Sequence, residues 1–166
     1  MRKDLKPFVL SAMQGDRQAY GVIYEEYAAD MYRFALSICK NTYDAQDAVQ
    51  DTALSVFKSI GTLKNPEKFK SYLFTSLSNA CKKRLTENVS AEELADTADD
   101  DSGIELSLSV REALGKLDGQ SREILMLSVA GGFKSHEIGE ILKMPAATVR
   151  TKRRRALEKM REELEL

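Results

Sequence analysis

Apolar residues recur at three- and four-residue steps between residues 19 and 60, a spacing that predicts amphipathic helices. Gly15-Asp16 predicts the end of one segment and the start of a helix, because aspartate is a preferred N-cap residue. The stripe that follows predicts one long helix or two, and its tyrosines suggest either a stacking platform or a packed core. Aromatic stripes at helical spacing are usually core, so we interpret this one as core. Its members are Ala19, Tyr20, Ile23, Tyr24, Tyr27, Met31, Phe34, Ala35 and Ile38.

A second helix is predicted between residues 41 and 60, with Asp44 as its N-terminal cap. Its opposite face is acidic and rich in amides, and it carries one exposed leucine. Such a face cannot hold DNA, so it is either merely solvated or meets a basic protein surface. The predicted buried stripe consists of Ala45, Ala48, Val49, Thr52, Ala53, Val56, Phe57 and Ile60.

A loop rich in Gly and Asn-Pro follows at residues 61–68 and leads into a helix over residues 69–85. Basic residues in this helix alternate with tyrosine and phenylalanine. Unpaired nucleic acid calls for such a mixture, because cations track phosphates while rings stack on bases. The alternative is that the cations at residues 82–84 simply complement the negative C-terminal end of the helix.

The last third of the chain predicts two helices joined by a tight turn. Residues 135–142 form a short amphipathic helix, residues 143–145 a turn ending in proline, and the second helix is strongly basic. This is the helix-turn-helix pattern, whose second helix lies in the DNA major groove. A solvated helical hairpin is the alternative. The packing stripe of the second helix consists of Val149, Ala156, Met160 and Leu164.

Composition and charge add two constraints. The chain has 166 residues, of which 43% are hydrophobic and 31% charged, and its apolar runs are far shorter than the ~20 residues of a membrane span. It also starts without the apolar core of a signal peptide, so we expect a cytoplasmic protein without membrane insertion. The net charge of −1 hides an uneven distribution, with +4 in residues 1–85, −8 in residues 86–110 and +3 in residues 111–166. Basic blocks can therefore still bind a polyanion.

Catalytic and metal chemistry find little support in the sequence. Cys39 and Cys81 stand alone, so we expect two buried, reduced thiols. His136 is the only histidine, and the run it opens resembles a zinc-protease motif but ends in Glu140 instead of a second histidine. We therefore expect no metal, no cofactor and no enzymatic activity, and we interpret His136 as a surface or DNA-backbone-contacting residue.

Taken in order, these segments resemble a known family, the bacterial sigma factors of the extracytoplasmic-function (ECF) type. The most specific block is Asp44-Ala-Gln-Asp47-Ala-Val-Gln50-Asp51-Thr52. Further blocks are Gly15-Asp16 with Ala19-Tyr20 and Tyr24-Glu-Glu-Tyr27, Ser71-Tyr72-Leu73 with Asn79, and Pro145-Ala-Ala147-Thr148-Val149-Arg150. The resemblance covers nearly the whole chain.

The resemblance implies an all-α protein of two small domains, an N-terminal helical bundle and a C-terminal helix-turn-helix bundle, joined by an acidic flexible linker. Residues 1–85 correspond to sigma region 2, which binds core RNA polymerase and melts the minus-ten element. Residues 86–108 correspond to the linker, either a phosphate mimic in polymerase channels or a plain solvated tether. Residues 109–166 correspond to region 4, which reads the minus-thirty-five element. The implied partners are core RNA polymerase, duplex and melted promoter DNA, and an anti-sigma factor.

The family's roles carry over to three sets of residues. The contact with core polymerase is expected from Asp44, Gln46, Asp47, Gln50, Asp51 and Leu54. The minus-ten strand is expected to meet Lys64, Asn65, Phe69, Lys70, Tyr72, Phe74, Asn79, Lys82, Lys83 and Arg84. The minus-thirty-five duplex is expected to meet Thr148, Arg150, Thr151, Lys152, Arg153, Arg154 and Arg155.

Three positions depart from the family pattern, with Ala147 in place of a frequent glycine, Arg153 in place of a frequent leucine and Lys83 in place of a frequent aspartate. Arg153 lies on the apolar side of its helix, so we expect its stem to pack and its guanidinium to emerge towards DNA or an acidic neighbour. The main alternative to a sigma factor is an autonomous helix-turn-helix regulator, which would need a dimer surface or an effector domain.

Overall fold

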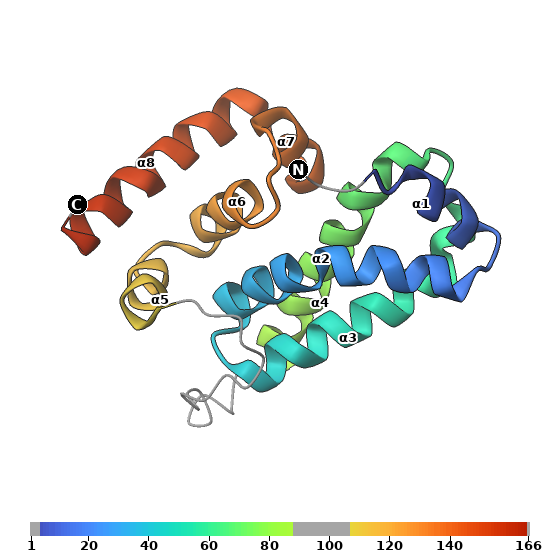
Figure 1. Ribbon diagram of the computed structural model, residues 1–166. Coiled ribbons are helices and arrows are strands. Elements are labelled where there is room, and N and C mark those ends of the chain that lie inside the picture. The colour runs from blue at the N-terminus through green and yellow to red at the C-terminus, as the bar shows by residue number, and fades with distance from the viewer. Residues whose placement is uncertain (1–3, 88–106, 166) are drawn as a thin grey trace.

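The computed structural model describes residues 4–87 and 107–165, so nearly all of the predicted linker lies outside the described residues. The described part is mostly helical and contains no strand, which confirms the all-α prediction (Figure 1). Two 3-10 turns, η1 (Ile60–Thr62) and η2 (Pro66–Lys68), interrupt the order of helices. The helices are α1 (Lys6–Met13), α2 (Arg17–Cys39), α3 (Thr42–Ser59), α4 (Phe69–Glu87), α5 (Leu108–Gly115), α6 (Gly119–Val129), α7 (Ser135–Leu142) and α8 (Ala146–Leu164).

α2 is one continuous helix of 23 residues, and both of its ends have local causes. The Asp16 carboxylate accepts hydrogen bonds from the N–H groups of Gln18 and Ala19 at 3.0 and 3.1 Å, as the sequence predicted. At the other end Lys40 adopts a left-handed conformation with φ 67°, which stops the helix. The stripe interpreted as core is confirmed as core, because its aliphatic residues are buried and its tyrosines pack against them.

The predicted cap of α3 was wrong by three residues. Asn41 is the N-cap, and its Oδ1 accepts a hydrogen bond from the N–H of Asp44 at 2.8 Å. Asp44 lies in the first turn, where its charge still favours the helix N-terminus. Its Oδ2 accepts a hydrogen bond from the Asn41 side-chain amide at 2.8 Å. Both residue types cap well, and this reciprocal pair places the helix start at Thr42.

α2, α3 and α4 pack together as an N-terminal bundle, and α1 packs against α2 (Figure 1). The rings of Phe34 and Phe74 meet edge to face, with their centroids 6.0 Å apart. Such pairs stabilise a core beyond the area that they bury. α4 contributes the buried residues Phe69, Leu73, Phe74, Leu77, Ser78 and Cys81.

In the C-terminal bundle, formed by α5 to α8, the buried side chain of Arg122 joins α6 to the end of α5. Its Nε donates to the carbonyl of Leu114 at 2.9 Å, and Nη2 donates to the carbonyl of Leu117 at 2.7 Å. The Leu114 carbonyl also accepts from the N–H of Leu117 at 3.1 Å, so the guanidinium adds a second bond there and ties the chain at the C-terminal end of α5 to α6. Burial lowers the pKa of Arg122 from an ordinary value so high that the group stays charged.

α7, the turn at residues 143–145 and α8 reproduce the predicted helix-turn-helix pair. Lys143 adopts a left-handed conformation with φ 58° at the end of α7. A Cβ at Gly139 would lie only 2.6 Å from the carbonyl oxygen of Met144, so the close approach of α7 and the turn requires glycine there. Ile138 of α7 is buried in the core of this bundle. The local sequence thus fixes the geometry of the pair.

The two bundles pack against each other, with α6 against α2 and α7 against α4 (Figure 1). The rings of Phe74 and Phe133 meet edge to face across the contact, with centroids 5.4 Å apart. Buried residues of both bundles consequently form one hydrophobic cluster. The division into two domains at residues 86–108 stays a prediction.

Candidate nucleic-acid interface

The outer face of α8 carries the cations predicted to meet duplex DNA. Arg150, Arg154 and Arg155 are exposed, and the nearest carboxylate to Arg154 is that of Glu158 at 4.0 Å. Within residues 4–87 and 107–165, neither Arg150 nor Arg155 has an ion pair. An exposed pair at that distance stabilises very little. These three guanidinium groups are thus available to base edges or phosphates.

The other polar residues predicted for this contact are held by the protein itself. Lys152 Nζ donates to Gln120 Oε1, and Arg153 Nε donates to Ser128 Oγ at 2.8 Å, so both side chains are tied to α6. The Arg153 guanidinium was expected to emerge towards DNA or an acidic neighbour, and within the protein it reaches the Ser128 hydroxyl. Thr151 Oγ1 donates back to a carbonyl of its own helix at 3.1 Å, and Thr148 is half-buried.

Of the residues predicted to meet the minus-ten strand, five polar ones are exposed: Lys64 and Asn65 in the loop, and Asn79, Lys82 and Lys83 on α4. Asn65 is already engaged, because its Oδ1 caps η2 by accepting from the N–H of Glu67 at 3.0 Å. Lys83 lies 3.9 Å from Glu87, one turn away on the same helix. These five residues form the accessible part of the predicted single-strand contact, although Lys82 is paired with Glu123.

The aromatic part of that prediction needs correction. Phe69 and Phe74 are 2% and 0% exposed, so both rings belong to the hydrophobic core and present no face to a base. Tyr72 is half-buried and shares a hydrogen bond with Ser59 Oγ. α4 is enclosed on more than one side, by α2 and α3 and also by α7, so its aromatic residues point inward.

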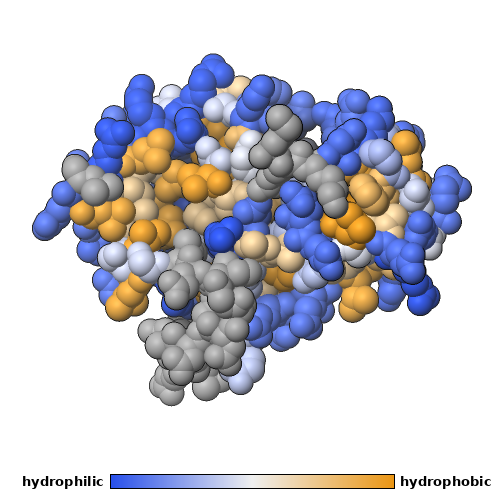
Figure 2. Space-filling model, in the orientation of Figure 1, coloured by the Kyte–Doolittle hydropathy of each residue, from blue (hydrophilic) through white to orange (hydrophobic). Residues whose placement is uncertain are grey.

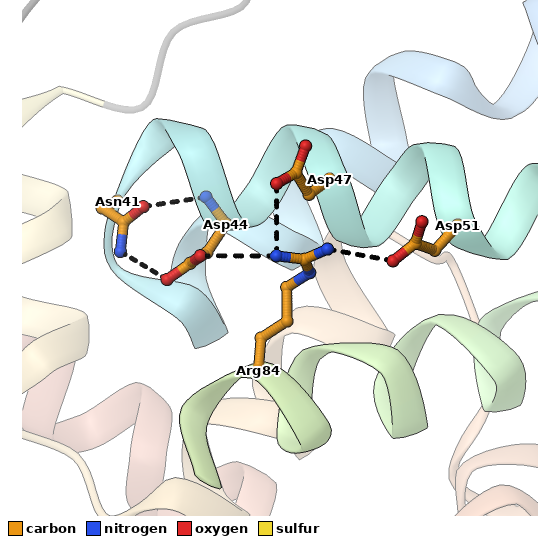
Figure 3. A network of polar contacts seen from close by, with 5 residues as sticks. All are labelled: Asn41, Asp44, Asp47, Asp51 and Arg84. Carbon is orange, nitrogen blue, oxygen red and sulfur yellow. Dashed lines mark hydrogen bonds and ion pairs between the residues drawn. The ribbon is translucent and has the colours of Figure 1, made fainter. Parts of the chain in front are cut away.

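Arg84, also predicted to meet DNA, instead lies among three aspartates of α3 (Figure 3). Its Nη1 is 3.2 Å from Asp47 and 3.7 Å from Asp44, and its Nη2 donates to Asp51 at 3.0 Å. Burial lowers the pKa of Arg84, but the carboxylates of Asp51, Asp47 and Asp44 outweigh this and raise it overall. The acidic face of α3 is thus paired with an arginine of the same chain and is also exposed to solvent.

The face of α3 predicted to meet polymerase nevertheless remains accessible. The carboxylates of Asp47 and Asp51 are more than half exposed, and Gln46 and Gln50 are exposed beside them. Leu54 lies on the same helix and is 62% exposed. Acidic, amide and apolar groups therefore share one surface.

Two further cations of α4, Lys70 and Lys82, point to the C-terminal bundle. Lys70 Nζ lies 4.7 Å from the centroid of the Phe133 ring, and Lys82 Nζ lies 3.2 Å from the carboxylate of Glu123. The Glu123 carboxylate is buried and also accepts a hydrogen bond from Ser78. Sequence reasoning missed Glu123 and Phe133. A signal was present, since Glu123 directly precedes a run of four apolar residues that faces the core.

A shallow apolar groove lies between α5, α6 and α8. Figure 2 shows hydrophobic surface over this part of the molecule. Leu114 and Met126 form part of the groove floor, and Val129 at its edge is 67% exposed. Arg33 and Asp30 of α2 also line it.

Both bundles match known protein families. Residues 23–90 match the Sigma-70 region 2 family, and residues 107–160 match the Sigma-70, region 4 family. RNA polymerase sigma factor SigV of Bacillus subtilis is 31% identical over 84% of this chain and 87% of its own length. ECF RNA polymerase sigma factor SigW of the same organism is 24% identical over 99% of this chain and 98% of its own. The chain belongs to the ECF sigma factors.

The fold of this sigma factor agrees with that assignment. The sigma factor RpoE of Bartonella quintana, solved in complex with the anti-sigma factor NepR, superposes with a TM-score of 0.68. It is 25% identical, and the match covers 82% of this chain and 90% of that one. The α7–α8 pair lies within the region 4 match, and the acidic face of α3 lies within the region 2 match. In the described part of this sigma factor, no helix has the length and apolar character needed to cross a membrane.

Proposed function

We propose that this sigma factor is a dissociable promoter-specificity subunit whose three contacts lie on three different helices. The face of α3 docks on a basic surface of core RNA polymerase, the loop before α4 and α4 itself hold the melted minus-ten strand, and α8 reads the minus-thirty-five element. Residues 1–85 and 109–166 act as the two working domains, and residues 86–108 join them.

The observation that carries this proposal is the opposition of charge between α3 and α8. The exposed carboxylates and Leu54 on α3 suit a basic protein surface and would repel DNA. The exposed guanidinium groups of α8, on the second helix of a helix-turn-helix pair, suit the major groove. One chain that offers both faces is suited to bring polymerase and promoter together.

On α8, Arg150 and Arg154 are the candidates for contacts with guanine or phosphate, and Arg155 for the backbone, because all three are exposed. Lys152 and Arg153 reach DNA only after they leave Gln120 and Ser128. We therefore assign them a secondary role, in which they orient α8 on α6.

For the minus-ten strand, Lys64, Asn65, Asn79 and Lys83 offer the first contacts, because they are exposed and, unlike the exposed Lys82, are not paired with Glu123. Lys70, Lys82 and Arg84 can take part only after their present partners release them. Tyr72 is the one predicted ring that is not fully buried, so it is the candidate for stacking on a base.

Three further features complete the proposal. The solved complex of RpoE with the anti-sigma factor NepR supports an anti-sigma partner for this chain as well. A subunit that serves RNA polymerase acts in the cytoplasm. The chemistry of nucleotide addition belongs to core polymerase, so the sigma factor itself needs no catalytic group, metal or cofactor.

The decisive experiment is in vitro transcription by core polymerase on a library of genomic fragments, with and without this protein, followed by mapping of the start sites. We expect new start sites that share two sequence elements at a fixed spacing. Transcripts that do not change, together with a failure to bind core polymerase in gel filtration, would exclude a sigma factor. A dimer that binds duplex DNA without polymerase would favour the autonomous regulator.

A further inference from the structure

A polar pocket lies between α3 and α4, where Arg84 reaches from one helix to the other (Figure 3). Its volume is about 220 Å³, many times the space of roughly 15 Å³ that one ordered water needs. α3 supplies Thr52 and Ser55 to the lining, and α4 supplies Ser76. This α3–α4 pocket therefore has room for a small organic molecule.

The hydroxyl groups of these three residues have no hydrogen-bond partner within residues 4–87 and 107–165. Thr52 is the most informative of them, because the residue is 2% exposed and its Oγ1 is buried. A neighbouring hydroxyl on α4 does find a partner, since Thr75 Oγ1 donates to the carbonyl of Ser71 at 2.7 Å. A buried hydroxyl without a hydrogen bond is costly and uncommon. The pocket thus offers hydrogen-bonding groups that the described part of the chain does not use itself.

Charged groups surround these hydroxyls in equal numbers of each sign. The cations are Lys83 and Arg84 and the anions are Asp51 and Glu87, so the lining has no net charge. Arg84 Nη2 donates to Asp51 at 3.0 Å. Lys83 Nζ lies 3.9 Å from Glu87, and both of these side chains are more than half exposed, so this pair stabilises little and can open for a ligand.

The balance of charge restricts the class of ligand. A phosphate or sulfate ion would bring its charge next to the two carboxylates, and a simple cation would lie beside the ammonium and guanidinium groups. A neutral polyol would satisfy the hydroxyls but would gain nothing from the charged groups. A small zwitterion suits both, because its opposite charges can pair with Lys83 and Glu87 while its other polar atoms meet the hydroxyls.

We propose that the α3–α4 pocket is a binding site for a small zwitterion of the size of a free amino acid. The carboxylate of the ligand pairs with Lys83, its ammonium group pairs with Glu87, and its side chain exchanges hydrogen bonds with Thr52. The site goes beyond the proposed function, because neither core polymerase nor promoter DNA is its ligand. It shares Asp51 with the face expected to dock on polymerase, so a bound zwitterion lies directly beside that contact.

The site can be tested by NMR, with the backbone amide shifts of the free chain followed during titration with each of the standard L-amino acids. At least one of them should give saturable shifts confined to residues 50–56 and 76–87. Its Kd should be about 1 mM, which is ordinary for a ligand of about ten non-hydrogen atoms. The amide and the N-acetyl derivative of that amino acid each lack one charge, and both should bind at least about tenfold more weakly.

Thr52→Val removes the buried hydroxyl and nearly keeps the shape of the side chain. It should weaken binding of the amino acid at least about fivefold, and it should not lower the Tm of the ligand-free chain, because no hydrogen bond is lost. Thr75→Val is the matched control, since it makes the same substitution outside the pocket and removes the bond to Ser71. It should keep the wild-type Kd and lower the Tm by about 2–4 °C.

Any of three results would overturn the site: no saturable shift with any standard amino acid, equal binding of the two derivatives, or wild-type binding by Thr52→Val. A Thr52→Val chain that loses as much Tm as Thr75→Val would also contradict it, because the hydroxyl would then be satisfied by an ordered water within the protein. Binding to core polymerase is measured separately by gel filtration. A chain that binds the amino acid but not polymerase contradicts the proposed function and leaves the pocket intact.

Discussion

α4 and α8 both carry a cluster of cations expected to meet DNA, but the two helices present them in opposite ways. On α8 the guanidinium groups of Arg150 and Arg155 extend into solvent, with no ion pair among the described residues. On α4, Arg84 lies among three aspartates and Lys82 pairs with Glu123. The helix proposed to read duplex DNA thus has unpaired cations in the described part of the chain, while on the helix proposed to hold a single strand Arg84 and Lys82 are paired with carboxylates of the same chain.

This difference suits the order of events in promoter opening. Duplex DNA is present from the start, so a permanently exposed cationic helix can search for it. Melted DNA appears only later, and exposed cations with aromatic rings would attract any nucleic acid in the meantime. Internal carboxylates reduce that attraction until the correct strand competes with them.

The largest effect is expected from a substitution that tests whether the phenylalanine rings of α4 belong to the core. Phe74→Ala should lower the free energy of unfolding by about 3–5 kcal/mol, because it removes a buried ring that contacts Phe34 and Phe133. Chemical denaturation measures the loss. Tyr43→Ala, at a ring that is 72% exposed, is the control and should change stability by less than about 0.5 kcal/mol. Equal, small losses for both would place Phe74 outside the core.

The next effect tests the exposed face of α8. Arg150→Ala should weaken binding to the minus-thirty-five element by about 1–3 kcal/mol if its guanidinium makes a bidentate base contact. Holoenzyme footprinting on a mapped promoter measures this. Arg161→Ala, on the last turn of the same helix, keeps the helix and removes a distant cation, and it should leave the footprint unchanged. An unchanged footprint for Arg150→Ala would remove this residue from the contact.

A smaller effect separates the two roles of the acidic face of α3. Reversing Asp47 and Asp51 to lysine should weaken binding to core polymerase by roughly 1–2 kcal/mol, through lost charge complementarity. Arg84→Ala removes the internal partner but leaves the carboxylates, so it should retain wild-type affinity while it lowers stability by about 1 kcal/mol. Titration of labelled sigma factor into core polymerase distinguishes them. Equal losses of affinity in both variants would mean that the carboxylates serve only the fold.

The smallest effect concerns the tie between α8 and α6. Ser128→Ala removes the hydroxyl that accepts from Arg153, and it should change promoter affinity by less than about 0.5 kcal/mol. A large gain in affinity would show that Arg153 is held back from DNA. A large loss would show that the tie orients the whole helix.

Local features of the fold could be predicted from the sequence. The bounds of α7 and the start of α2 follow from caps, glycine and proline within a few residues, and the structure has them there. The cap of α3 was missed because Asn41 and Asp44 are both good caps, and only their mutual hydrogen bonds decide between them. The periodicity of apolar residues cannot decide which of two neighbouring polar residues caps a helix.

The sequence predicted the exposure of site residues correctly only where that exposure is determined by the pattern of a single helix. Exposed cations on α8 follow from its own pattern, but the burial of Phe69 and Phe74 depends on helices that cover α4 from several sides. The pairs of Arg84 with α3 and of Lys82 with Glu123 join residues 33 to 41 positions apart in the sequence. Such tertiary pairings leave no periodic signal in the sequence. The sequence pattern of a helix is therefore the same whether its basic residues are exposed to solvent or paired with carboxylates of another helix.

Arg122 has a consequence for how the C-terminal bundle could be used in protein engineering. Because its guanidinium fastens the end of α5 to α6 from within, the junction of these two helices is held by hydrogen bonds inside the C-terminal bundle. Grafting residues 107–165 onto a foreign protein should therefore keep this junction intact. The graft would leave Phe133 and Glu123 uncovered, so these two positions need polar and neutral replacements before such a chimaera can stay soluble.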